Sequence, residues 1–441
     1  MNTRYGHETG IPLTYGHLHS WFPEAVSFLR RVSLSGALSA SPRSSRGPRF
    51  TRPIGTAAGF LSLLLLLALP FPALGASRPP PTLKIGVLAP LSGPYAAGGT
   101  SFVQAATLAV EQANAEGGIF GQRVTIAVAD TQGRVDVAKA EALRLVSREK
   151  VSAMVGAYLS EETVGVMEVA AAHRTVLIVP VAATAEITDK IRQEYERYRY
   201  VFRVGYSLPQ WAEMISAFLS DRKVRRYGFV GAGIRWNLEL GETLERIVAP
   251  GGIAPVYTAF YSPGNPAFDP VAVAVAAASP DIVILGDPGR NSVSFLKRLR
   301  EVAPALPVLS IGGALGDARL AASLPLSAPV YVQAAAWRGV SPAATAYVER
   351  YEHRYGALPV GYSDTLPYDA VTVLVDAWRK AGSAESAAVV PVLERGTFPG
   401  VAGMYRFDAA HQARWGTGPG ALRGTFVLWE RDGARIVFPL R

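Results

Sequence analysis

The feature that most constrains the fold is an alternation of short apolar runs with amphipathic segments along residues 83–311. The first run, residues 83–89 (LKIGVLA), is almost continuously apolar, which is typical of a parallel strand covered on both faces. After a Gly/Ser/Pro loop, apolar residues between 102 and 113 recur at three- to four-residue spacing and predict one face of a helix. Strands and helices that alternate with short joints predict parallel sheets with right-handed crossovers.

The alternation occurs twice, which predicts two similar α/β lobes. In a first series we expect strands at 83–89, 123–129, 151–155 and 176–178, and helices at 102–113, 135–148 and 161–173. In a second series we expect strands at 227–230, 254–258, 281–285 and 308–311, and helices at 208–220, 238–248, 270–278 and 292–302. The tail adds a strand at 330–335, helices at 343–355 and 366–381, and a hairpin at 424–429 and 434–438.

A chain of 441 residues exceeds the usual size of one domain, so two are expected. We assign residues 1–76 to an N-terminal extension and signal peptide. Residues 82–203 and about 336–402 are assigned to lobe I, and residues 204–335 and about 403–441 to lobe II.

The apolar run at 57–69 predicts a secretory signal peptide. It follows Arg49 and Arg52 and precedes small residues at 73–76. As a helix it would rise only about 20 Å, less than the roughly 30 Å core of a membrane. We therefore expect cleavage near 73–77 and a soluble product in the periplasm or another extracytoplasmic space; an uncleaved membrane anchor is the alternative. Residues 1–41 precede this leader, and we favour a translation start downstream of them.

Composition excludes several classes of function. The chain has no cysteine, and its scattered histidines lack metal-ligand spacing, so we expect no disulfide, metal or cofactor. Of the net charge of +9, residues 1–76 carry +5 (seven Arg and two acids), which leaves +4 and no basic block for nucleic acid. Hydrolase, phosphate-loop, metalloprotease and dinucleotide-binding motifs are absent from the sequence, so we do not expect an enzyme.

Short motifs occur at the predicted strand and helix ends in a characteristic order. They are Ile85-Gly86-Val87 with Ser92-Gly93-Pro94, residues 114–119 (NAEGGI), Gly121, Asp130, Val155-Gly156 with Ser160, residues 180–185 (PVAATA) and Tyr368-Asp369-Ala370-Val371. In order and spacing they resemble the leucine/isoleucine/valine-binding protein family, the periplasmic solute receptors of branched-chain amino acid ABC transporters. The resemblance covers most of residues 83–438.

The resemblance implies an α/β fold of two Rossmann-like lobes with parallel sheets, joined by three crossing strands around a ligand cleft. It also implies that Ser160, the backbone of Ala182, and Thr184 bind the α-amino acid head group of the ligand. Independently, open α/β sheets bind ligands beyond the carboxyl ends of their strands, where helix N-termini offer free N–H groups. Ser160 and Thr184 both follow predicted strands; simple helix capping or a turn is the alternative role.

The chain departs from the family pattern at three positions. Ala314 stands where amino-acid binders often have an acid, and Gly98 stands where an aromatic residue roofs the pocket, which would leave more room. Asp287 replaces a tyrosine expected near Gly286 and could supply the missing negative charge; an ordinary turn before a helix is an equal alternative.

These departures predict that plain leucine or valine binds poorly, because an unpaired buried ammonium costs several kcal/mol. We expect a larger ligand, either aromatic or aliphatic, with a carboxylic acid or an amide without the α-amino group as the favoured guess. If Asp287 points into the cleft, an amino group could still be accepted. Tyr95, Tyr206 and Trp236 are the candidates for packing against it, with surface or hinge packing as the alternative.

The expected function is that of an extracytoplasmic solute-binding receptor of an ABC importer. It would bind an amino acid or a related small carboxylate or amide by lobe closure, act as a monomer, and deliver the ligand to a membrane permease. A ligand-sensing ectodomain or regulator on the same fold is the second hypothesis, and an exported α/β enzyme is the third.

Overall fold

Two β-sheets organise the part of the chain that this computed structural model describes, namely residues 82–264, 266–316, 323–431 and 433–439. These residues belong to the same compact unit of the chain. The predicted signal peptide and the N-terminal extension lie outside the described residues. Within those ranges, no helix combines the length and apolar character that crossing a membrane requires.

The first sheet is entirely parallel, as predicted, with the strand order β2-β1-β3-β4-β5. Its strands are β1 (Thr82–Ala89), β2 (Arg123–Asp130), β3 (Ala153–Val155), β4 (Val176–Val179) and β5 (Val201–Arg203). The helices of this part are α2 (Ala96–Ala115), α3 (Val135–Ser147), α4 (Ser160–Ala172), α5 (Glu186–Gln193) and the short α6 (Tyr195–Tyr198).

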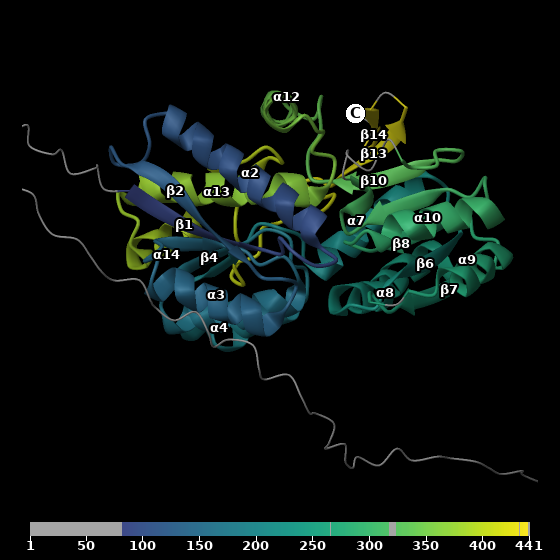
Figure 1. Cartoon of the computed structure of the whole chain (residues 1–441), viewed down its shortest axis with the longest axis horizontal. Helices are drawn as coiled ribbons and strands as arrows, with labels where there is room; N and C mark the ends of the chain where they lie inside the picture. The colour runs from purple at the N-terminus through teal and green to yellow at the C-terminus, as the bar shows by residue number, and fades with distance from the viewer. Residues whose placement is uncertain (1–81, 265, 317–322, 432, 440–441) are drawn as a thin grey trace, which may run out of the picture. The chain divides into compact units, whose positions relative to one another are not determined.

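Both faces of this sheet are covered, which explains why its strands lack a polar alternation. Successive residues of β1 point to opposite faces: Val87 packs in the core that includes Phe102 of α2, and Leu88 packs in the core that includes Leu145 of α3. Figure 1 shows α2 and the later helix α13 (Tyr362–Ala381) on one side of β1, with α3 and α4 on the other.

The second sheet has seven strands in the order β14-β13-β10-β9-β8-β6-β7. The strands are β6 (Arg226–Ala232), β7 (Ala254–Tyr261), β8 (Ile282–Gly286), β9 (Val308–Ile311), β10 (Val330–Ala334), β13 (Thr425–Glu430) and β14 (Gly433–Phe438). The first five are parallel, and the predicted hairpin β13–β14 joins β10 in antiparallel pairing. Its helices are α7 (Leu208–Asp221), α8 (Arg235–Val248), α9 (Phe268–Ala277) and α10 (Asn291–Val302).

The remaining elements are α12 (Pro342–Tyr355), α13, α14 (Ser386–Arg395) and the two-residue strands β11 (Phe398–Pro399) and β12 (Met404–Tyr405). Although they follow β10 in the sequence, α13 packs against α2 and contacts β3 and β4 of the first sheet. The chain therefore passes between the sheets three times: after β5, after β10 and after β12. We call the first sheet with its helices the first lobe, and the second sheet with its helices the second lobe.

At the outer edge of the first sheet, a side chain forms hydrogen bonds with backbone groups of the edge strand. β2 is an edge strand, and the Asn114 amide at the end of α2 binds Val124 of β2 in both directions. Asn114 Nδ2 donates to the Val124 carbonyl, and the Val124 N–H donates to Asn114 Oδ1, each over 2.8 Å. The amide thus replaces the neighbouring strand that an edge strand lacks.

We predict that Asn114→Ala lowers the free energy of unfolding by roughly 1–3 kcal/mol, because it leaves a buried N–H and a buried carbonyl without partners. The free energy of unfolding of Asn114→Asp should lie between those of Asn114→Ala and the parent chain, because the aspartate can accept from the Val124 N–H but cannot donate to the Val124 carbonyl. Urea denaturation measures both, with the exposed Glu111→Ala as a control on the same helix. An Asn114→Ala chain as stable as this control would contradict the role of the amide.

Candidate ligand-binding site

The candidate residues from both lobes lie just after the carboxyl ends of parallel strands. Tyr95 follows β1, Ser160 follows β3, and Thr184 follows β4 in the first lobe. Trp236 follows β6 and Asp287 follows β8 in the second lobe. This is the edge at which open α/β sheets bind ligands, because helix N-termini and loops converge there.

The three residues that the resemblance assigns to the ligand head group, called the head-group residues below, lie close together. Ser160, Ala182 and Thr184 are buried, and the Thr184 N–H donates to Ser160 Oγ over 3.4 Å. Ser160 is the first residue of α4 and is not its cap; instead the Glu162 carboxylate accepts the Leu159 N–H over 3.0 Å. The Ser160 hydroxyl accepts the Thr184 N–H and donates to no partner among the described residues, so its proton is available for a ligand.

A buried arginine that the sequence reasoning missed holds this loop. Arg203, at the end of β5, is fully buried and donates through Nη1 to the carbonyls of Thr184 over 2.8 Å and Ala182 over 3.4 Å. Its Nε donates to Gln412 Oε1, and among the described residues no carboxylate lies within ion-pair distance. Burial lowers the pKa of Arg203 to about 9. The available signal was a charged residue within the otherwise apolar run 201–204 (VFRV).

The second lobe meets the head-group site through α8. Thr184 Oγ1 donates to Glu239 Oε2 over 2.8 Å, and the Arg235 N–H donates to Glu161 Oε1 over 3.1 Å. Arg235 also pairs with Glu186 over 2.5 Å and with Glu239 over 2.8 Å. A carboxylate of the second lobe, Glu239, therefore lies beside the head-group threonine, a contact that no sequence motif indicated.

Two of the predicted aromatic residues belong to one buried cluster. Its members are Tyr206, Trp211, Trp236, Tyr362 and Trp415. Trp211 stacks on Trp236 with 5.0 Å between ring centroids, and Tyr206 meets Trp415 edge-on at 4.6 Å. Burial raises the pKa of Tyr206, whose hydroxyl has no hydrogen-bond partner among the described residues. The cluster includes Tyr206 of the first passage and Trp415 of the third, so it also packs the connections between lobes.

Tyr95 lies with a second group, around Asp287. Burial and then the nearby carboxylates of Asp287, Glu161 and Glu162 raise the pKa of Tyr95 to about 12. Glu161 and Glu162 belong to the first lobe and Asp287 to the second, so the Tyr95 hydroxyl lies near carboxylates of both lobes. A Cβ built on Gly289 of the second lobe would lie 3.7 Å from Cδ1 of Tyr95, so Tyr95 lies at the contact between the lobes and not in the aromatic cluster.

Asp287 is a buried carboxylate without a cation. Its Oδ2 accepts the Tyr261 hydroxyl over 2.6 Å and its Oδ1 accepts the Gly289 N–H over 2.5 Å. No described Lys, Arg or His lies within ion-pair distance of it. Burial raises the pKa of Asp287 to about 6, and the two hydrogen bonds offset this shift only in part.

The space expected beside Gly98 is occupied. A Cβ built on Gly98 would lie 2.1 Å from the hydroxyl oxygen of Tyr158, so the Tyr158 ring fills the volume that a larger residue at 98 would take. The expectation of extra room at this position is therefore wrong, because an aromatic side chain from the loop after β3 supplies the missing bulk. The side chain of Ala314 lies outside what the structure describes.

Among the described residues, no group of three or more Asp, Glu or His side chains could hold a metal ion. The polar groups of the site are instead hydroxyls, backbone amides and single carboxylates, which recognise an organic ligand.

Comparisons with known proteins agree with this architecture. A family model described as periplasmic binding protein matches residues 82–417. Leu/Ile/Val-binding protein homolog 7 of Brucella abortus is 26% identical over 351 residues, covering 74% of this chain and 85% of that protein. A branched-chain amino acid transporter substrate-binding protein from Streptococcus pneumoniae, in complex with isoleucine, has a TM-score of 0.65 at 20% identity, covering 81% of this chain and 99% of that chain. An ABC transporter solute-binding protein from R. palustris, in complex with benzoate, has a TM-score of 0.68 at 20% identity, covering 81% and 95% respectively.

Two α/β lobes, three passages between them and strand-end residues contributed by both lobes define a type I periplasmic binding protein fold. The chain belongs to the periplasmic binding protein family. Its similarity to a Leu/Ile/Val-binding protein homolog agrees with the resemblance that the sequence motifs carry.

We predict that Arg203→Met lowers the free energy of unfolding by roughly 2–4 kcal/mol, because it leaves the Ala182 and Thr184 carbonyls buried without donors. Arg203→Lys should recover only part of this loss, since an ammonium cannot reach the same three acceptors in one plane. Urea denaturation of the two variants is the measurement. Equal stability of Arg203→Met and the parent chain would show that the guanidinium does not hold the loop.

Proposed function

We propose that the chain is the extracytoplasmic substrate-binding receptor of an ABC importer and that it binds an amino acid between its lobes. The single observation that carries this proposal is the buried Ser160–Thr184 pair at the start of α4, opposed by α8 of the second lobe. Family membership supports the transport role, the permease partner and the extracytoplasmic location. The relatives include proteins in complex with isoleucine and with benzoate, so the ligand must be argued from this chain.

The first lobe favours a carboxylate. The N-terminus of α4 carries unpaired N–H groups and the positive end of the helix dipole. The Ser160 hydroxyl can add a hydrogen bond, and Arg203 places an uncompensated positive charge behind the loop of residues 182–184. A carboxylate at this position gains from all three.

The second lobe favours an ammonium group. Asp287 is buried and has only neutral donors as partners, so an ionised Asp287 would be stabilised by a ligand cation. Glu239 adds a second carboxylate next to Thr184, although Arg235 compensates it. A ligand without an amino group would leave Asp287 unpaired. The unpaired Asp287 therefore favours an amino acid over the ligand without an α-amino group that Ala314 and Gly98 had led us to expect.

Binding would work by closure. A zwitterion held by its carboxylate in the first lobe and by its ammonium in the second binds both lobes only when they meet, and so shifts the population toward the closed form. The contacts of α8 with Thr184 and Glu161 would then add protein–protein bonds to the same closed form.

The direct test of the proposal is a calorimetric panel of amino acids and aromatic acids on the mature chain, followed by uptake of the tightest binder in a strain that lacks the gene. Loss of uptake supports an importer. Tight binding with undiminished uptake would instead favour the ligand-sensing alternative. Binding of benzoate in preference to every amino acid would overturn the ligand class.

We predict that Ser160→Ala weakens binding of the tightest amino acid by roughly 1–3 kcal/mol, because a buried charged group loses a hydrogen bond. Thr184→Ala should have a similar effect, since it also removes the contact with Glu239. The control is Thr163→Val on the same helix, whose lost hydroxyl binds only the Leu159 carbonyl. Calorimetry that finds Ser160→Ala and Thr163→Val equal in affinity would remove Ser160 from the site.

We predict that amino acid affinity falls about tenfold between pH 7 and pH 5, because Asp287, with a pKa of about 6, becomes protonated and loses its attraction for an ammonium. Asp287→Asn should bind weakly and show no such slope. The buried Asp369 also has a pKa raised to about 6, but it is present in both chains, so their difference isolates Asp287. Parallel pH profiles for the two chains would exclude an ammonium contact at Asp287.

The raised pKa of Asp287 also decides how the stability of the unliganded chain changes with pH. The folded pKa of Asp287 lies above the ordinary value of 3.8, so the folded chain without ligand loses stability as the pH rises from about 4 to about 6. A bound ammonium would reverse this by stabilising the ionised form.

A further inference from the structure

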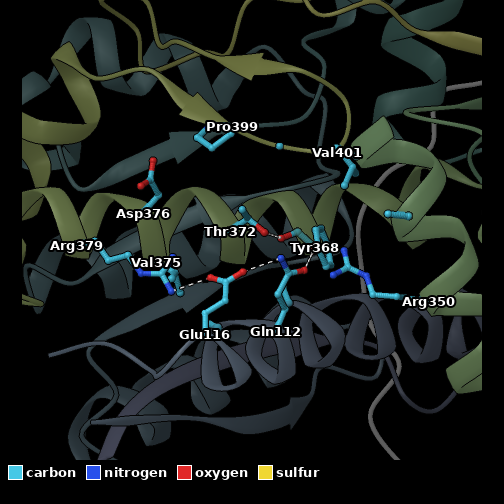
Figure 2. Close-up of a pocket in the computed structure, with 15 residues that line it drawn as sticks. Gln112, Glu116, Arg350, Tyr368, Thr372, Val375, Asp376, Arg379, Pro399 and Val401 are labelled. Atoms are coloured by element: carbon cyan, nitrogen blue, oxygen red, sulfur yellow. Dashed lines mark hydrogen bonds and ion pairs between the residues drawn. The ribbon is translucent and has the colours of Figure 1, made fainter. Parts of the chain in front are cut away.

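A second cavity lies away from the strand ends, between α2, α12, α13 and the β11–β12 hairpin (Figure 2). Its volume is about 410 Å³, within the range of small-molecule sites. None of the candidate residues of the strand-end site lines it. We propose that this cavity is a second ligand site, for an aliphatic monocarboxylate whose head group binds Arg350.

Among the described residues, one cation of the cavity lining has no carboxylate partner. Arg379 pairs with Glu116 over 3.0 Å, and Asp376 pairs with Lys380, outside the lining, over 2.7 Å. Arg350 of α12 has no carboxylate within ion-pair distance among the described residues. Each of the other charged lining residues therefore has an ion-pair partner, and Arg350 is the lining residue whose charge no described carboxylate pairs with.

A chain of hydrogen bonds orients that guanidinium. Arg350 Nη2 donates to the Tyr368 hydroxyl over 3.0 Å, and Tyr368 in turn donates to Gln112 Oε1. Gln112 Nε2 donates to Glu116 Oε1 over 2.9 Å, and Figure 2 shows this row of side chains along α2 and α13. Among the described residues, only one of the five N–H donors of Arg350 has an acceptor, which leaves the other donors for a carboxylate.

The rest of the cavity suits an apolar chain. Ala109 and Ala113 of α2, Val375 of α13 and Val401 of the hairpin are buried and supply an apolar lining. At the far end, Glu116 and Asp376 would repel a second carboxylate. A phosphate carries more negative charge than the single guanidinium of Arg350 balances, and Glu116 and Asp376 would repel it. A ligand with one carboxylate and one aliphatic chain would pair with Arg350 and would bring no second negative charge near Glu116 and Asp376.

The wall over the cavity is fixed in place. The buried carboxylate of Asp369 accepts the Val401 N–H over 2.7 Å, the Ala402 N–H over 3.0 Å and the Tyr405 hydroxyl over 2.7 Å. These bonds tie the hairpin that carries Val401 to α13. The cavity therefore does not depend on a ligand to shape it, which lowers the cost of binding.

The test uses the mature chain with valine methyl groups labelled for NMR and titrates it with hexanoate and with the neutral hexanamide. We expect hexanoate to shift the methyl signals of Val375 and Val401 in a saturable way, and hexanamide to bind at least tenfold more weakly. Arg350→Gln should weaken hexanoate binding at least fivefold. The matched control Arg354→Gln, one turn further along α12 and paired with Glu111, should bind like the parent chain.

Two further variants separate this site from the strand-end site and from a folding defect. Ser160→Ala should leave the hexanoate shifts at Val375 and Val401 unchanged. Ala346→Phe, at an exposed position of the lining, should abolish them by filling the cavity while the urea denaturation curve stays as in the parent. Absent shifts at both valines, or equal binding by Arg350→Gln and Arg354→Gln, would overturn the proposal, as would loss of these shifts in Ser160→Ala.

Discussion

The candidate site depends most on the buried guanidinium of Arg203. It binds the carbonyls of residues 182 and 184 and the side chain of Gln412, so one group connects the head-group loop, the end of β5 and the third passage. Gln412 in turn donates to the Gly205 carbonyl over 2.8 Å, in the first passage. Carbonyls buried at such a junction need a donor, and one planar group supplies several at once. The geometry of the head-group loop is thereby coupled to the segments that connect the lobes.

The buried charges are distributed between the lobes in a way that bears on the ligand. Arg203 lies in the first lobe behind the head-group loop, and Asp287 lies in the second lobe at the end of β8. Each lacks an oppositely charged partner within ion-pair distance among the described residues, and each carries a pKa shifted toward its neutral form by burial. Such groups cost free energy in the unliganded chain. A zwitterion between the lobes would recover part of that cost, whereas benzoate would address only the first lobe.

Helix α13 contributes residues both to the candidate site at the strand ends and to the cavity around Arg350. Its first residue, Tyr362, packs in the aromatic cluster with Tyr206 and Trp211, and its middle turns line the cavity around Arg350. Asp369, between them, holds the hairpin that covers the cavity. One rigid helix therefore contributes to two chemically different environments.

The alternation of apolar runs and helical segments was sufficient to predict both sheets, their parallel strands and the antiparallel hairpin at the end, because strand and helix periodicities are local properties. It missed α14, which contains Pro391, and the three-residue strand β5, whose pairing with β4 is not visible in so short a run. The pairing of Ser160 with Thr184 could be predicted because both follow neighbouring parallel strands. Only the tertiary structure decided that Tyr158 fills the space beside Gly98, that Glu239 meets Thr184 and that Arg350 meets a tyrosine hydroxyl and, among the described residues, no carboxylate. These arrangements join residues far apart in sequence, and their distances depend on how helices pack.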